Sequence, residues 1–106
     1  LVKPGLSMRE FGEKAWRIPD AYKAQRYSSV AHGVGMCDEW PRVPHAEDYA
    51  RSGYDAVLEP NMTFCVESYI GEVGGTEGVK LEQQVLVTET GYQILTTFPF
   101  EESLGG

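Results

Sequence analysis

One histidine and two glutamates in this chain have the residue types and the settings of a metal site. His32 stands in the run Ala-His-Gly-Val-Gly, and Glu67 and Glu82 are each the acid of an apolar, strand-like segment. An imidazole nitrogen and several carboxylate oxygens form a mixed donor set that suits Fe, Mn, Co or Zn. Carboxylates can bridge two cations while the imidazole ligates one of them, so these residue types would support a dinuclear centre.

Each of the three residues also has a simpler explanation. A lone histidine is more often a packed or surface residue than a ligand, although the glycines after His32 would let its backbone approach a bound group. Alternation along the two strand-like segments allows both Glu67 and Glu82 to be ordinary solvated residues. Spacing alone leaves these alternatives open. His45 has no comparable setting, and we expect it on a loop surface.

Two helical segments and a short strand are expected in the first third of the chain. Ser7 and Glu10 form a capping box, which predicts a helix from Ser7 to about Trp16. Pro19 interrupts it, and Asp20 is expected to cap a second helical stretch that ends near Tyr27. Residues 28–32 are expected to be extended, because the glycines that follow disfavour a helix.

The rest of the chain indicates an antiparallel sheet. Residues 37–59 are expected to be irregular, with at most one helical turn within 46–52. Residues 62–70 and 79–88 are rich in β-branched and aromatic side chains and predict two strands. A turn at Glu89-Thr90-Gly91 then returns residues 92–96 antiparallel. The predicted fold class is α+β, with helices packed on a curved antiparallel sheet.

Composition excludes several classes of function. The chain has 106 residues, 42% of them hydrophobic, which suits one small packed domain. Its net charge is −7 and its nine basic residues are scattered, so neither nucleic acid nor an anionic membrane is an expected partner. No apolar run approaches the roughly 20 residues of a membrane span. Cys37 and Cys65 are expected to be buried, reduced thiols of a cytoplasmic protein, with a disulfide between them as the alternative.

The order of these motifs resembles the C-terminal half of the catalytic domain in the M24, or pita-bread, superfamily, which includes methionine aminopeptidase, prolidase and creatinase. Residues 81–99, LEQQVLVTETGYQILTTFP, match the closing hairpin of prolidase-like members almost position by position. By this resemblance, His32, Glu67 and Glu82 are three of five ligands of a two-metal centre, and two Asp ligands lie upstream. Residues 1–106 would then be the C-terminal portion of a single catalytic domain, inactive alone, and the intact protein a homodimer.

One departure from that pattern changes the expected chemistry. Peptidases of the superfamily carry a second histidine in a His-Glu-x-Pro motif, and this chain has Asp38-Glu39-Trp40-Pro41 there. An anion at this point would oppose the oxyanion that forms when a carbonyl is hydrolysed. A carboxylate suits a different task, which is to take a proton from a carbon atom. Glu39 is expected to be a solvated loop acid.

This pattern resembles the DddP-type dimethylsulfoniopropionate lyases, which cleave a sulfonium zwitterion to dimethyl sulfide and acrylate. The resemblance implies two metal ions that hold the substrate carboxylate, with iron as the first choice and Mn, Co, Zn or Ni as alternatives. It implies that Asp38 removes the α proton, that Tyr27 belongs to the catalytic site, and that Tyr27 and Trp40 hold the sulfonium by cation–π contact. Core packing is the alternative for both aromatics. The alternative functions are an Xaa-Pro metallopeptidase and a non-catalytic binding module of the same fold.

Overall fold

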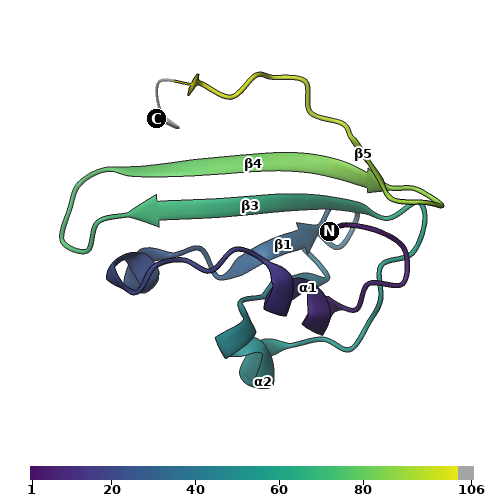
Figure 1. The fold of residues 1–106 in the computed structure, drawn as a ribbon, viewed down its shortest axis with the longest axis horizontal. Coiled ribbons are helices and arrows are strands. Elements are labelled where there is room, and N and C mark those ends of the chain that lie inside the picture. The colour runs from purple at the N-terminus through teal and green to yellow at the C-terminus, as the bar shows by residue number, and fades with distance from the viewer. Residues whose placement is uncertain (103–106) are drawn as a thin grey trace.

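An antiparallel sheet covered on one face by helices organises residues 1–102, the part of the chain that this computed structural model describes (Figure 1). Within these residues the sheet has five strands in the order β2-β1-β3-β4-β5, and every neighbouring pair is antiparallel. The strands are β1 (Ser29–Gly33), β2 (Arg42–Pro44), β3 (Thr63–Gly71), β4 (Gly78–Val87) and β5 (Tyr92–Ile94). The predicted α+β class is confirmed. Residues 103–106, the end of the predicted domain, lie outside the described part.

The first two helical elements begin near their predicted positions but are shorter, whereas two short helices fill residues 46–52, where at most one turn was expected. The helical elements are α1 (Met8–Lys14), the 3-10 helix η1 (Asp20–Gln25), the 3-10 helix η2 (Ala46–Asp48) and α2 (Tyr49–Ser52). The Ser7 hydroxyl accepts from the Glu10 backbone N–H at 3.1 Å, so one half of the predicted capping box forms. The Glu10 side chain instead pairs with Lys14. The prediction that Asp20 caps the second helix is wrong, because its carboxylate pairs with Lys23 at 2.8 Å.

The two long strands lie within one residue of their predicted bounds, whereas β2 was not predicted. Its three residues, Arg42–Pro44, lie in the segment expected to be irregular. They carry no pattern of their own, and their extended form comes from pairing with β1, as in the pair of Ala31 with Val43. The last strand, β5, is shorter than predicted, and the segment after it runs back along β4 in Figure 1.

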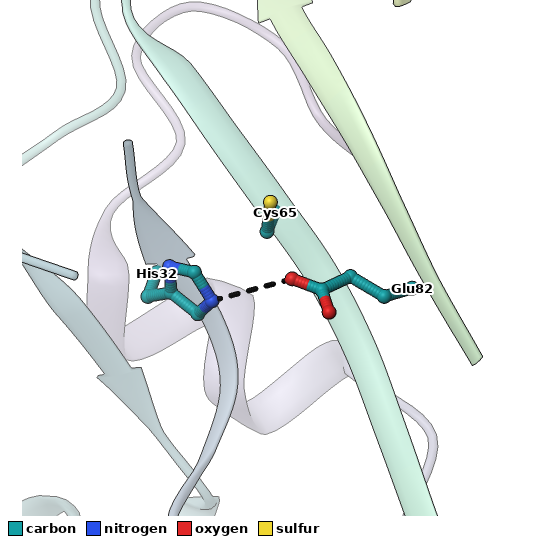
Figure 2. A group of neighbouring side chains, drawn as sticks. All are labelled: His32, Cys65 and Glu82. Carbon is teal, nitrogen blue, oxygen red and sulfur yellow. Dashed lines mark ion pairs between the residues drawn. The ribbon is translucent and has the colours of Figure 1, made fainter. Parts of the chain in front are cut away.

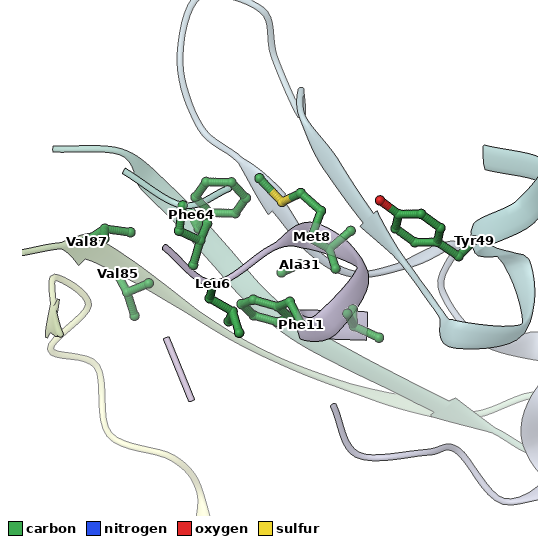
Figure 3. Packing of buried hydrophobic residues seen from close by; sticks show 11 residues of the cluster. Leu6, Met8, Phe11, Ala31, Tyr49, Phe64, Val85 and Val87 are labelled. Atoms are coloured by element: carbon green, nitrogen blue, oxygen red, sulfur yellow. The ribbon is translucent and has the colours of Figure 1, made fainter. Parts of the chain in front are cut away.

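The core lies between α1 and one face of the sheet (Figure 3). Met8 and Phe11 of α1 pack against Phe64 of β3 and against Val85 and Val87 of β4, and all five side chains are buried. Truncating a buried aromatic of this kind to alanine costs about 3–5 kcal/mol of stability. The helix therefore secures one face of β3 and β4, and the alternate side chains of these strands face the other way.

Gly33 allows a turn to fold back over the end of β1. Its backbone N–H donates to the Pro41 carbonyl at 2.8 Å. A Cβ atom at Gly33 would lie 2.3 Å from the Trp40 carbonyl oxygen, whereas a Cβ at Gly35 would meet nothing within 4 Å. Gly33 is therefore required by the close approach of the Trp40 carbonyl, whereas Gly35 is not.

This difference predicts unequal effects of two alanine substitutions. Gly33→Ala places a methyl group against a backbone carbonyl, which must shift, and overpacking of this kind costs about 1–3 kcal/mol. Gly35→Ala is the matched control and should change stability by less than about 0.5 kcal/mol. Denaturant unfolding of both variants measures the difference. Equal free energies of unfolding for the two variants would show that the turn accommodates the methyl group at Gly33 without loss of stability.

Candidate metal centre

Strand register brings the predicted ligands to one face of the sheet. His32 on β1 is paired with Cys65 on β3, and Glu67 on β3 is paired with Glu82 on β4. Residues paired across antiparallel strands point to the same face, as do residues two apart on one strand. The four side chains therefore gather on the face opposite Phe64 and the core. Figure 2 shows His32 and Glu82 directed toward each other, with Cys65 beside them.

His32 Nε2 faces both carboxylates. It lies 3.4 Å from Glu67 Oε1 and 3.5 Å from Glu82 Oε1. The other ring nitrogen, Nδ1, lies 2.9 Å from the Gly33 carbonyl oxygen. A carbonyl only accepts, so the proton of the neutral ring is on Nδ1 and the lone pair of Nε2 points at the acids. This is the arrangement in which metal-ligating histidines are usually held.

Lys80 neutralises charge between the two acids. Its Nζ lies 2.6 Å from Glu67 Oε2 and 3.2 Å from Glu82 Oε2. Like charges directly opposite each other on a sheet are destabilising, and this ammonium offsets that repulsion. The pairing with Glu67 raises the pKa of Lys80. Each carboxylate thus turns one oxygen to Lys80 and the other to His32.

The buried carboxylate of Glu67 lacks a complete set of donors. Its side chain is 0% exposed, and within residues 1–102 neither of its oxygens accepts a hydrogen bond of normal geometry. The Lys80 ammonium faces one of its oxygens, and the lone pair of His32 Nε2 faces the other. A buried ionised carboxylate with so few donors is costly. A bound cation would complete this environment, so the donor set fits a metal ion.

Cys65, which was not among the predicted ligands, lies beside them. Its sulfur, a nitrogen of His32 and an oxygen of Glu82 all lie within 4.8 Å of one another. Burial, followed by the hydrogen bond to Glu82, raises the pKa of the Cys65 thiol to about 12, so the neutral thiol donates to that carboxylate. Burial alone would raise the pKa of Glu82, but hydrogen bonds from Cys65 and Lys80 lower it overall. The sequence signal for Cys65 was its place two residues before Glu67.

Tyr27 lies beside this group and is held by two residues that sequence reasoning placed in solvent. Its hydroxyl donates to Glu39, at 3.0 and 2.9 Å from the two carboxylate oxygens. The Nε2 of His45 donates to the Tyr27 carbonyl at 2.8 Å. The Tyr27 ring centroid is 4.6 Å from Lys80 Nζ. The expectations for Glu39 and His45 are wrong, because the first is bonded to Tyr27 and the second is buried.

Asp38 and Trp40 do not join the group. Among the described residues, no hydrogen bond, ion pair or ring contact links either side chain to His32, Glu67 or Glu82. Asp38 is exposed in a turn, with φ at 58°, and its N–H donates to the Gly35 carbonyl. Trp40 is 52% exposed and packs edge-on against a tyrosine ring, with centroids 4.9 Å apart.

The remaining sequence expectations concern cysteine state and membranes. Cys37 and Cys65 are both free, so the disulfide alternative is wrong, and Cys37 is exposed rather than buried.

Among residues 1–102, no helix combines the length and the hydrophobicity that crossing a lipid bilayer requires.

The fold and the site together define a class of protein. The model of metallopeptidase family M24 matches residues 1–89, and the chain belongs to this family. Members of the family generally depend on two metal ions, and a group able to bind metal is present here. A solved structure, the Xaa-Pro dipeptidase from Bacillus anthracis, is 32% identical with a TM-score of 0.65 and covers 94% of this chain and 27% of that one. The predicted pita-bread fold is confirmed.

Two particular relatives are similar over the whole chain. The dimethylsulfoniopropionate lyase DddP of Roseovarius nubinhibens is 46% identical over 106 residues, which are all of this chain and 24% of that protein. The DddP lyase of Roseobacter denitrificans is 43% identical over the same coverage. The resemblance drawn from sequence motifs is confirmed. The chain spans about a quarter of the length of these curated relatives.

Removal of either acid from the site should remove metal. Glu67→Ala and Glu82→Ala each delete a carboxylate that faces His32. We expect metal affinity to fall by at least about 10–100-fold in the whole protein, the scale seen even for outer-shell partners of metal ligands. Elemental analysis after dialysis measures the bound metal. Glu77→Ala, an exposed acid in the turn between β3 and β4, is the matched control. Full metal content in Glu67→Ala would remove Glu67 from the ligand set.

Proposed function

We propose that the protein is a metal-dependent lyase that cleaves dimethylsulfoniopropionate to dimethyl sulfide and acrylate. The observation that carries this proposal is the 46% identity to a DddP lyase over the full length of the chain. It is supported by the acid Asp38 at the position where peptidases of the family have a histidine. We also propose that residues 1–106 are the C-terminal portion of one catalytic domain.

The metal centre in this proposal is built on His32, Glu67 and Glu82. His32 offers Nε2, and the two glutamates offer the oxygens that face it. Two aspartates from outside this chain would complete five ligands. Iron is the first choice, with Mn, Co, Zn or Ni as alternatives. When bound, the metal ions would hold and polarise the carboxylate of the substrate, which makes the neighbouring C–H bond more acidic.

Asp38 is the proposed base. It takes the proton from the carbon next to the substrate carboxylate, and the electron pair of that C–H bond forms the double bond of acrylate. The C–S bond breaks, and its electron pair leaves with sulfur as dimethyl sulfide. Among the described residues, no hydrogen bond or ion pair occupies the Asp38 carboxylate, which leaves its oxygens free for this role. Its exposed turn also gives it access to a bound substrate.

Tyr27 and Trp40 are the proposed binding residues for the sulfonium group. The Tyr27 ring already lies 4.6 Å from an ammonium, which supports a cation-binding role. We keep Tyr27 as a candidate catalytic residue as well, although its hydroxyl proton is engaged with Glu39. Trp40 is half exposed, so part of its ring is open to a ligand.

The second candidate is an Xaa-Pro metallopeptidase. The 32% identity to the Bacillus anthracis Xaa-Pro dipeptidase favours it. Asp38 speaks against it, because a carboxylate there would repel the oxyanion of a hydrolysed peptide bond. A non-catalytic binding module is the third reading, and a buried carboxylate poised for a cation speaks against that one. In each reading we propose a small-molecule ligand, a homodimer and a cytoplasmic location.

The base assignment predicts a selective loss of turnover. In the whole, metal-loaded protein, Asp38→Asn should lower dimethyl sulfide release by about 10²–10⁴-fold, the scale for losing a positioned base. Metal content and substrate binding should persist, because Asp38 is not among the ligands. Headspace gas chromatography measures the product, and Glu77→Gln serves as the control for loss of one acid. Near-normal release by Asp38→Asn would rule out the mechanism, and cleavage of Xaa-Pro dipeptides by the wild type would favour the peptidase.

The ligand count predicts that residues 1–106 alone are inactive. Three donors leave the metal centre without the two aspartates that the family pattern requires. The isolated chain should bind divalent metal weakly and release no dimethyl sulfide above background, while the whole protein does both. Measurable lyase turnover by residues 1–106 would contradict the five-ligand centre.

A further inference from the structure

Tyr27 is held at two points beside the carboxylates. Its hydroxyl donates to both oxygens of Glu39, and its backbone carbonyl accepts from His45. Glu39 is itself held, because Arg42 Nη2 lies 2.7 Å from Oε2. The Tyr27 ring therefore cannot turn away from the site without breaking a charge-assisted hydrogen bond.

The face of this ring is a place where the fold already holds a cation. Lys80 Nζ lies 4.6 Å from the ring centroid, and the same ammonium lies 2.6 Å from Glu67. The ring thus borders the space next to the candidate ligands. The hydrogen bond to Glu39, with burial, raises the pKa of Tyr27 and keeps the phenol neutral. A phenol that donates to a carboxylate also gains electron density, which strengthens its attraction for a cation.

We propose that Glu39 is a positioning residue that fixes Tyr27 so that its ring presents one face to the positive group of the substrate. The identity of that group as a sulfonium rests on the function proposed above. Lys80 is 40% exposed on a flexible stem, so a substrate cation can replace its ammonium at the ring. Glu39 touches no substrate and acts only through Tyr27.

A double-mutant cycle in the whole, metal-loaded protein tests this assignment. The probe is 3-(trimethylammonio)propionate, a zwitterion with the same spacing between carboxylate and cation, and calorimetry measures its binding. Glu39→Ala and Tyr27→Phe remove the same anchor from its two ends while the ring stays. Each should weaken binding about 3- to 30-fold, the range of one cation–π contact, and the double variant should be no weaker than either. Glu39→Gln keeps an acceptor oxygen and should fall between, and Glu77→Gln should bind as the wild type does.

A second measurement follows Tyr27 without any ligand. In protein labelled with 3-fluorotyrosine, the ¹⁹F resonance that Tyr27→Phe removes identifies this residue. That resonance should shift in Glu39→Ala and Glu39→Gln, while the other tyrosine signals stay in place. A change confined to one signal separates loss of the anchor from general misfolding.

The outcomes separate this assignment from the proposed function. Four results would each overturn the role assigned to Glu39. They are additive effects in the double variant, unchanged probe binding in Glu39→Ala, an unmoved Tyr27 resonance, and a wild type that does not bind the probe. If the wild type binds the probe and the cycle is non-additive, Glu39 has the assigned role. This holds even if the protein releases no dimethyl sulfide, a result that would refute only the lyase proposal.

Discussion

Two carboxylates that face each other across β3 and β4 are the constraint on which the site depends. Glu67 and Glu82 are a directly opposed pair, and such a pair repels unless a cation lies between them. Lys80 supplies one positive charge from two residues before Glu82, on the same face of β4. It engages one oxygen of each acid and leaves the other facing His32. The same repulsion makes the site receptive to metal ions, which carry more charge than an ammonium.

The apolar face of the sheet makes this polar face possible. Phe64 and Val85 lie against α1 in the core, and the strand period then obliges Cys65, Glu67 and the even-numbered residues of β4 to face the opposite way. A slip of one residue in the β3–β4 register would expose the valines and bury the acids in the core, at a large cost. Core packing therefore holds the acids in place although it touches none of them.

The loop after β1 and the residue after β2 hold Tyr27 beside the candidate ligands. Gly33 permits the chain to fold back, and the returning segment brings Glu39 to the hydroxyl of Tyr27. His45, at the end of β2, holds the backbone of the same tyrosine. The loop that carries Asp38 and Glu39 thus also holds the Tyr27 ring beside the candidate ligands.

The sequence by itself determined the two long strands, the start of α1, the α+β class and the candidate ligands. The strands and the start of α1 depend on local signals, namely β-branched and aromatic content and a capping serine. The candidate ligands depended on the resemblance of the surrounding motifs to a family. Only the tertiary structure decided that Cys65 joins the group, that Lys80 bridges the acids, and that Glu39 and His45 hold Tyr27. Each of these contacts joins segments whose closeness is set by strand register or by the return of a loop. The strand β2 belongs with them, because three residues without a pattern become extended only when β1 offers its hydrogen-bonding edge.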